Sequence, residues 1–303
     1  MILLTGGTGA VGRSIAEHLI SSNKDFVLVT RDKSITSLLE DKHCNIVQGN
    51  IFDSQFLKRL FGEYKFETVV HCAWNAVRSD LRNDTIQFDN IIACRELLEE
   101  AGKNKVKTFI GFGSQAEYGV YNEQITEDFL PKPTTLYGVS KLAAGLTGKI
   151  IAQKYGFRFA WLRLFAAYGP NDKSDFVIPY AINCLLNDKN PQLSTCEQLW
   201  DYLYLKDIPL IIDKIIHSTH YFNDIYNLSF GVAHKLKDII LFLKELTVSK
   251  ANLDFGAISN NGDLFFLEGS NSKLKKEFGI GDLTSIKKGL TLTVEWHKNR
   301  IRA

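Results

Sequence analysis

The sequence lacks three features that would assign the chain to other classes of protein. Its formal net charge is only +2 over 303 residues, so it gives no electrostatic reason to expect nucleic acid or an anionic membrane as the main partner. No apolar run reaches the roughly 18 residues of a membrane span. The start, Met1 followed by ILLTGG, has neither a basic segment nor a long apolar one, which predicts the absence of a secretory signal.

Cysteine is scarce and scattered. The chain has five cysteines, and no two of them form a CxxC pair. This spacing argues against a zinc site and against a disulfide framework, and it is typical of a reducing cytosol. Hydrophobic residues at 45% and charged residues at 23% are ordinary for a soluble globular protein. We therefore expect a cytoplasmic protein with no bound metal.

What the sequence does contain is an alternation of apolar runs and helical patterns. The runs at 1–5, 26–30, 45–49, 68–73, 108–113 and 158–165 read as buried strands, and 11–22 and 86–104 read as helices. This alternation predicts an α/β fold with a Rossmann-type doubly wound parallel sheet. After 167–172 the pattern loosens, which predicts a smaller mixed α/β C-terminal lobe for the substrate.

The predicted domains follow from that change of pattern. We expect a dinucleotide-binding domain over 1–167, joined by parts of 205–229. We expect the substrate-binding lobe over 168–204 and 230–303.

The first predicted turn carries the clearest binding motif. TGGTGAVG, residues 5 to 12, lies between an apolar strand and an amphipathic helix. Glycines allow a tight turn and close approach of the backbone to a pyrophosphate, and the helix start presents free N–H groups to the phosphates. The sequence therefore predicts a dinucleotide site with these residues: Gly6, Thr8, Gly9, Ala10, Val11 and Gly12.

The end of the second predicted strand bears on the choice between NAD and NADP. An acidic residue there would bind the ribose 2′-hydroxyl, whereas an arginine would accept a 2′-phosphate. The sequence reads LVTRDK, with Arg31 ahead of Asp32. Arg31 could be only a solvated cation of the loop. We expect NADP as the cofactor, with NAD as the alternative.

Tyr137 and Lys141 are four residues apart in TLYGVSKLAAG, a spacing that places both on one face of a helix. A free tyrosine has a pKa of about 10, and a neighbouring ammonium favours the phenolate. Tyr137 could then exchange a proton with a carbinol oxygen while hydride moves to or from the cofactor. A YxxxK pair alone is weak, because it arises by chance on many helices.

Taken in order, the motifs resemble the extended short-chain dehydrogenase/reductase family, in its nucleotide-sugar epimerase and reductase branch. They are the N-terminal TGxxGxxG, VVHCA at 69–73, Asn90, Ser114 four residues before Tyr118, and YxxxK. The resemblance implies that Ser114 hydrogen-bonds the reacting sugar oxygen, Tyr137 is the acid/base, Lys141 lowers its pKa and Asn90 has a supporting place. We expect Ser114 to be a donor rather than a turn residue or a nucleophile, because no histidine is placed to activate it.

The resemblance also extends the expected contacts. It implies further cofactor contacts from Asn50, Ile51, Cys72 and Ala73, besides Tyr137 and Lys141. For the substrate it implies a region that includes RLFAAYGP (163–170) and WDYLYLKD (200–207). The candidate substrate-binding residues are Trp74, Gln115, Phe165, Ala166 and Trp200. Trp74 could equally fill the core. Arg163, on a predicted buried strand, could simply be satisfied by backbone carbonyls.

The residues after Ser114 separate activities within the resemblance. Dehydratases of this family carry an acidic pair there, whereas this sequence has Gln115 and Ala116, with Glu117 one position late. The leading hypothesis is therefore an NADP(H)-dependent reductase of a nucleotide-linked 4-keto-6-deoxy sugar. The alternatives are a nucleotide-sugar C4 epimerase with tightly bound NAD and, from another class, a non-catalytic dinucleotide-binding regulator. The resemblance suggests a homodimer through the helices that hold Asn90 and Tyr137.

Overall fold

A computed structural model gives the fold, and it describes residues 1–32, 39, 41–172, 174–259 and 265–302. The chain divides into two compact units. The first contains 1–119, 127–164 and 208–227, and the second contains 120–126, 165–207 and 228–303. Among the helices described, none has the length and apolar character needed to cross a membrane.

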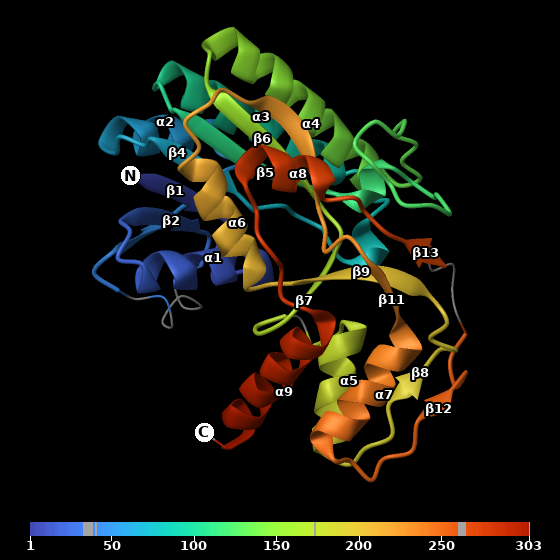
Figure 1. The fold of residues 1–303 in the computed structure, drawn as a ribbon. Helices are drawn as coiled ribbons and strands as arrows, with labels where there is room; N and C mark the ends of the chain where they lie inside the picture. The colour runs from blue at the N-terminus through green and yellow to red at the C-terminus, as the bar shows by residue number, and fades with distance from the viewer. Residues whose placement is uncertain (33–38, 40, 173, 260–264, 303) are drawn as a thin grey trace. The chain divides into compact units, whose positions relative to one another are not determined.

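A seven-stranded sheet forms the centre of the first unit (Figure 1). Its strand order is β10-β6-β5-β4-β1-β2-β3, and the pairs from β6 to β3 are parallel. The strands are β1 (Ile2–Thr5), β2 (Phe26–Thr30), β3 (Cys44–Gln48), β4 (Thr68–His71), β5 (Thr108–Ser114), β6 (Arg158–Leu164) and β10 (Asn223–Leu228). This confirms the doubly wound fold, and the predicted strands end within two residues of the observed ones.

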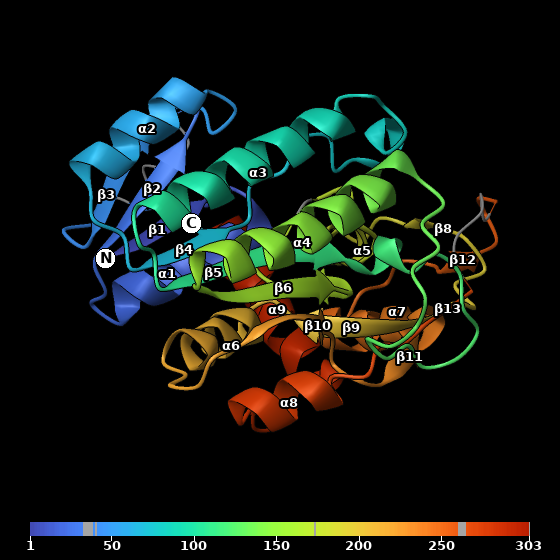
Figure 2. The ribbon, with the colours of Figure 1, turned by 90° about the horizontal axis from the view of Figure 1, so that it is seen from above.

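Helices cover both faces of this sheet, which explains why its strands are apolar without alternation. Figure 2 shows α2 (Ser54–Glu63), α3 (Gln87–Lys103) and α4 (Leu136–Tyr155) together on one face. On the other face lie α1 (Ala10–Ser21) and α6 (Asp207–Ile216). Between them, His18 Nε2 and Asp213 Oδ2 are 2.6 Å apart.

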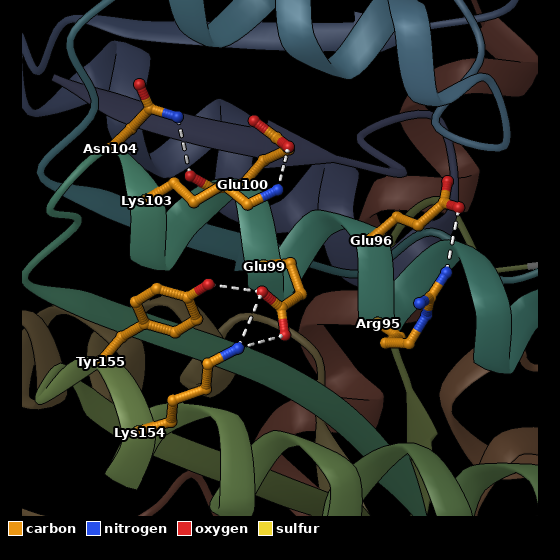
Figure 3. Close-up of polar contacts among 8 residues, drawn as sticks. All are labelled: Arg95, Glu96, Glu99, Glu100, Lys103, Asn104, Lys154 and Tyr155. Carbon is orange, nitrogen blue, oxygen red and sulfur yellow. Dashed lines mark hydrogen bonds and ion pairs between the residues drawn. The ribbon is translucent and has the colours of Figure 1, made fainter.

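The two long helices α3 and α4 pack against each other, and polar contacts join their ends (Figure 3). Glu99 of α3 accepts hydrogen bonds from the Tyr155 hydroxyl at 2.5 Å and from Lys154 Nζ at 3.2 Å, both at the end of α4. Buried apolar residues of α3, Cys94, Leu97 and Leu98 among them, belong to the core on this face of the sheet. These contacts hold α3 and α4 against each other in the first unit.

The second unit has its own sheet and core. In the sheet, β9 (Leu199–Tyr204) pairs with β7 (Ala166–Tyr168), β11 (Ala233–Lys235) and β13 (Phe266–Leu267). A separate two-stranded sheet is formed by β8 (Gln192–Leu193) and β12 (Asp254–Phe255). The helices are α5 (Val177–Leu186), α7 (Leu236–Thr247), α8 (Ser272–Phe278) and α9 (Ile286–Arg302). Buried side chains of α5, α7 and α9 form its apolar core with those of the strands.

A buried carboxylate connects three backbone segments of this second unit. Asp201 of β9 has no exposed surface. Its oxygens accept hydrogen bonds from the backbone N–H groups of Phe230 at 2.7 Å, Gly231 at 2.8 Å and Gly269 at 3.4 Å. Backbone donors that are buried away from water need such an acceptor, so Asp201 fixes the chain around 230 and 269.

We predict that Asp201→Ala destabilises the protein strongly. Three backbone N–H groups would lose their acceptor, and we expect the free energy of unfolding to fall by about 2–4 kcal/mol. Urea denaturation monitored by circular dichroism measures this change. Asp282→Ala, at an exposed position of the same unit, is the matched control and should change stability by less than about 0.5 kcal/mol. Equal stability of the two variants would contradict the assigned role.

Candidate active site

The glycine-rich turn after β1 has the geometry of a phosphate cradle. Gly6 has φ +73°, which favours glycine. A Cβ on Gly12 would lie 2.3 Å from the Gly6 carbonyl oxygen, so only glycine fits there. Helix α1 begins after Gly9 without a side-chain cap. Its first N–H groups therefore face outward at the positive end of the helix dipole, which fits a dinucleotide pyrophosphate.

The other candidate cofactor residues lie at the same edge of the sheet. Cys72 and Ala73 follow β4, next to β1, and the Ala73 backbone passes within 2.7 Å of where a Gly6 Cβ would be. This is the switch point of the strand order, where ligands of doubly wound folds bind. Arg31 is exposed at the end of β2, and its carbonyl accepts a hydrogen bond from Gln48.

Asn50 and Ile51 follow β3, the strand that pairs with β2. Asn50 is exposed, and its side-chain oxygen accepts a hydrogen bond from the Phe52 N–H at 3.2 Å. Ile51 is buried in the core, so only Asn50 of the two offers a free surface. In the described part of the chain, no group of three or more His, Cys, Asp or Glu side chains is arranged to hold a metal ion.

Tyr137 and Lys141 lie in the first two turns of α4, as the spacing predicts. The helix starts there because Thr135 caps it, accepting a hydrogen bond from the Gly138 N–H. Both side chains are buried. Lys141 Nζ donates to the Phe112 carbonyl at 2.6 Å and lies 5.9 Å from the centroid of the Tyr137 ring. Burial lowers the pKa of Lys141 to about 7.

The environment of Tyr137 keeps its hydroxyl protonated. Burial raises the pKa of Tyr137 above its usual value, and the Glu117 carboxylate adds to the rise. Two groups oppose it: a hydrogen bond with the Ser114 hydroxyl and the positive charge of Arg82. The Arg82 guanidinium lies 5.2 Å from the ring centroid. In this structure the cation that favours the phenolate is thus Arg82, and the role expected of Lys141 stays a prediction.

Ser114 corrects one expectation. It is a turn residue as well as a candidate donor, because its Oγ accepts a hydrogen bond from the Ala116 N–H at 3.2 Å and caps the short helix η3 (Gln115–Glu117). Glu117 completes this capping box by accepting a hydrogen bond from the Ser114 N–H. Since the cap uses Oγ as an acceptor, its O–H remains available to donate.

Glu117 itself is fully buried, with 0% of its surface accessible. Its Oε1 accepts from the Ser114 N–H and from Trp161 Nε1, both at 2.9 Å. Its Oε2 accepts from Arg163 Nε at 2.7 Å. A Cβ on Gly113 would lie 2.3 Å from Glu117 Oε1, so glycine at 113 leaves space for the carboxylate. Glu117 points into the core of the first unit.

Arg163 is therefore satisfied by a carboxylate and not by the backbone carbonyls that the sequence suggested. Its guanidinium also lies 4.3 Å from the centroid of the Tyr118 ring. Burial is the largest single influence and lowers the pKa of Arg163, but the charge of Glu117, the effect of Tyr118 and the hydrogen bonds with both together raise it overall. The Tyr118 hydroxyl in turn donates to Asn227 Oδ1 at 2.7 Å. This ion pair and its neighbours hold the segment from Ser114 to Tyr118.

Asn90 supports the site indirectly. It is buried in α3, and its side-chain oxygen accepts a hydrogen bond from the Asn75 N–H at 2.7 Å while its amide donates to the Asn75 carbonyl at 3.3 Å. These two bonds hold the loop after β4. Trp74 of this loop is partly buried, and its ring meets that of Tyr137 edge-on, with 6.4 Å between centroids.

The structure brings together only some of the candidate substrate residues. Gln115 is next to Ser114, and its Oε1 is a buried acceptor without a hydrogen-bond partner in the described residues. Phe165, Ala166 and Trp200 belong to the second unit. There Phe165 is buried with its ring against Gly269, whereas Ala166 and Trp200 are partly exposed. Phe165 is thus placed as a core residue of that unit.

Sequence reasoning missed Arg82, Gln87 and the Glu117–Arg163 pair. One signal was available for the pair: an arginine within a buried strand and a glutamate at the end of the neighbouring strand each need a partner, and β5 and β6 are adjacent. Arg82 gave no such signal, because it lies in a polar segment before α3, and Gln87 gave none, because a glutamine at the start of a helix is usually exposed.

A comparison with family models matches residues 2–229 to one family, described as the NAD dependent epimerase/dehydratase family. The chain belongs to this family. The match covers the glycine-rich turn, Ser114, Tyr137 and Lys141, and it confirms the resemblance drawn from the motifs.

Relatives agree with this assignment. The chain is 25% identical to an uncharacterized UDP-glucose epimerase of Bacillus subtilis, over 96% of this chain and 95% of the relative. A UDP-glucose 4-epimerase from Thermotoga maritima, solved with UDP-glucose, has a TM-score of 0.87 at 23% identity and covers 99% of both chains. A dTDP-glucose 4,6-dehydratase from Bacillus anthracis, solved with NAD, has a TM-score of 0.87 at 20% identity over 99% and 97%. The two structures show a shared fold.

We predict that Glu117→Gln destabilises this epimerase/dehydratase family member. A glutamine can keep the two donors on Oε1, but its NH₂ would face Arg163 and leave that cation buried and unpaired. We expect the free energy of unfolding to fall by about 3–5 kcal/mol, measured by urea denaturation.

Two further variants make this prediction specific. Glu63→Gln, at an exposed position of α2, is the matched control. The double variant Glu117→Gln with Arg163→Met removes both charges and keeps an acceptor for the Ser114 N–H and the Trp161 indole, so it should be more stable than Glu117→Gln. A Glu117→Gln protein as stable as the control would show that the ion pair does not hold this segment.

Proposed function

We propose that the protein is an NADP(H)-dependent reductase of a nucleotide-linked 4-keto-6-deoxy sugar, in which Tyr137 protonates the C4 oxygen. The observation that carries this proposal is the buried hydroxyl of Tyr137 next to Ser114, because burial raises the pKa of Tyr137 above its usual value. A group that holds its proton at neutral pH is suited to be the general acid of ketone reduction.

The chain's own residues supply the proton and the orientation. Ser114 donates a hydrogen bond to the ketone oxygen, which polarises the carbonyl and places it beside the Tyr137 hydroxyl. As negative charge develops on that oxygen, Tyr137 gives up its proton, and Arg82 stabilises the phenolate that remains. Gln115 Oε1, an acceptor without a partner in the described residues, accepts a hydrogen bond from a sugar hydroxyl.

The cofactor is held by the first unit. The glycine-rich turn and the start of α1 bind the pyrophosphate, and Arg31 binds a 2′-phosphate, which favours NADP(H). Lys141 binds the nicotinamide ribose. When bound, the reduced dinucleotide supplies the hydride for C4. The second unit binds the nucleotide part of the substrate, with Ala166 and Trp200 as the candidate contacts.

Elimination of water is not part of the proposal. Glu117 is the acidic residue nearest in sequence to Ser114, and it is buried and paired with Arg163. It is therefore committed to the core and is not an acid or base for a dehydratase. Gln115 and Ala116 cannot replace it in that role.

C4 epimerisation with tightly bound NAD is the second candidate. The Bacillus subtilis relative, similar over nearly its whole length, carries the name of an epimerase. The Thermotoga maritima structure is of a UDP-glucose 4-epimerase. The same Ser114, Tyr137 and Lys141 would serve this reaction, with Tyr137 acting first as base.

We predict that the purified protein oxidises NADPH when it meets one member of a panel of nucleotide 4-keto-6-deoxy sugars, and NADH more slowly. Tyr137→Phe removes the acid and should lower kcat by about 10²–10⁴-fold. Absorbance of the reduced nicotinamide at a fixed wavelength measures both. Tyr221→Phe, at an exposed tyrosine, is the control and should leave the rate unchanged.

Two other outcomes would overturn the proposed reductase activity. If no ketosugar is reduced but a 4-hydroxy nucleotide sugar is isomerised without added cofactor, the protein is an epimerase. Alternatively, Tyr137→Phe leaves the biological activity intact, which would indicate a non-catalytic dinucleotide-binding protein.

We also propose that the protein is a homodimer through α3 and α4. Each helix presents exposed apolar side chains along one stripe: Phe88 and Ile92 on α3, and Val139, Leu146 and Ile150 on α4. Ile92 is 52% and Ile150 69% exposed. Two packed helices with apolar outer stripes form a patch of the kind that marks a protein interface, and a second copy with two-fold symmetry would present the same patch.

We predict that Ile150→Asp converts this dimer to a monomer, because the interface would bury an unpaired carboxylate. Size-exclusion chromatography with light scattering measures the mass. Leu241→Asp, at an exposed helical position of α7 in the other unit, is the control and should remain dimeric. A wild-type protein that is monomeric at all concentrations tested would contradict the proposal.

A further inference from the structure

The ammonium of Lys141 lies on the face of an indole. Lys141 Nζ is 3.7 Å from the centroid of the Trp74 ring, well within the range of a cation–π interaction. The same Nζ donates to the Phe112 carbonyl at 2.6 Å. The lysine thus has two fixed contacts, one on β5 and one on the loop after β4, and it is buried between them.

The indole is itself held in place. Trp74 Nε1 donates to Gln87 Oε1 at 3.0 Å. Gln87, fully buried at the start of α3, donates through Nε2 to the carbonyls of Ala76 at 2.7 Å and Leu81 at 3.1 Å. Because Nε2 serves two carbonyls, the carbonyl end of the amide must face the indole. Gln87 therefore sets the orientation of Trp74.

The backbone next to Trp74 also depends on Gln87. Ala76 has φ +58°, a left-handed conformation that costs a residue with a Cβ about 1 kcal/mol or more. The Ala76 carbonyl is one of the two that accept from Gln87. If Trp74 only filled space in the core, three features would not be needed together: the left-handed conformation of Ala76, the hydrogen bond of the indole N–H and the cation on the ring.

We propose that Trp74 is a positioning residue for Lys141: its indole, anchored by Gln87, holds the ammonium beside Tyr137. The part of this inference that concerns catalysis rests on the proposed function, in which Lys141 binds the nicotinamide ribose next to the proton donor Tyr137. The contact between ring and ammonium does not depend on the substrate or on the direction of the reaction.

The charged and titratable groups around Lys141 determine how much the Trp74 ring affects the pKa of Lys141. Facing it are Glu117 of η3, Cys94 of α3, Cys72 and His71 at the end of β4, and Tyr137 on its own helix. Burial lowers the pKa of His71 to about 3, and burial raises the pKa of both thiols. At neutral pH these three groups are uncharged, so Glu117, the Phe112 carbonyl and the Trp74 face are the groups that favour the charged form of Lys141.

The test is a pH titration of Lys141 in protein labelled with ¹³C at lysine Cε, followed by NMR. The Lys141 signal is assigned by its loss in Lys141→Met. Trp74→Leu removes the ring and should lower the pKa of Lys141 by about one pH unit. Trp74→Phe keeps a ring but loses the anchor, and Gln87→Met loosens the indole, so both should give smaller downward shifts. Trp296→Leu, which removes a tryptophan of the other unit, should give none.

The outcomes separate this inference from the proposed function. A Lys141 titration that is the same in wild type, Trp74→Leu and Trp74→Phe overturns the positioning role. If the titration shifts while no ketosugar is reduced, the positioning role stands and the reductase fails. Where the reductase is active, its high-pH limb should move to lower pH in Trp74→Leu by the same amount, with kcat reduced more than KM is changed. Should Trp74→Leu fail to fold, Trp74→Phe and Gln87→Met carry the test.

Discussion

The carboxylate of Glu117 has no exposed surface, so each of its oxygens must find donors within the protein. One oxygen serves the Ser114 N–H and the Trp161 indole, and the other serves Arg163. These donors come from the end of β5 and from β6. The carboxylate thereby fixes where β5 ends and how the chain turns into η3. The place of Ser114, and with it the place of the hydroxyl beside Tyr137, follows from that constraint.

The same carboxylate has an electrostatic cost at the site. Glu117 raises the pKa of Tyr137, in addition to burial, and Arg163 is occupied with Glu117. The positive charge that acts on Tyr137 comes instead from Arg82, whose own carbonyl accepts the Tyr137 N–H at 2.8 Å. Arg82 thus fixes the backbone at the start of α4. Its charge also offsets part of the rise in the pKa of Tyr137 that burial causes. The balance leaves the phenol protonated, which favours its role as an acid over its role as a base.

Local patterns were sufficient for strands β1 to β6 of the sheet, the glycine-rich turn and the helical spacing of Tyr137 and Lys141. Each of these depends on residues within one strand–turn–helix unit, where periodicity and backbone sterics decide the structure. The supporting contacts could not be predicted in this way. Glu117 and Arg163 are 46 residues apart, and Ser114 was not expected to cap a turn. Such contacts are set by which strands become neighbours and by what a buried polar atom can reach.

The contacts of Lys141 show why this difference matters for function. A YxxxK spacing places the lysine on the correct face of α4, but it does not say where the ammonium goes. In the folded chain the Phe112 carbonyl and the Trp74 face receive it, and Gln87 and Asn90 at the start of α3 hold the loop that carries Trp74. The start of α3 is therefore connected to Lys141 of α4 through the Trp74 side chain. A residue on that loop thus acts on the site through the position of the Lys141 ammonium.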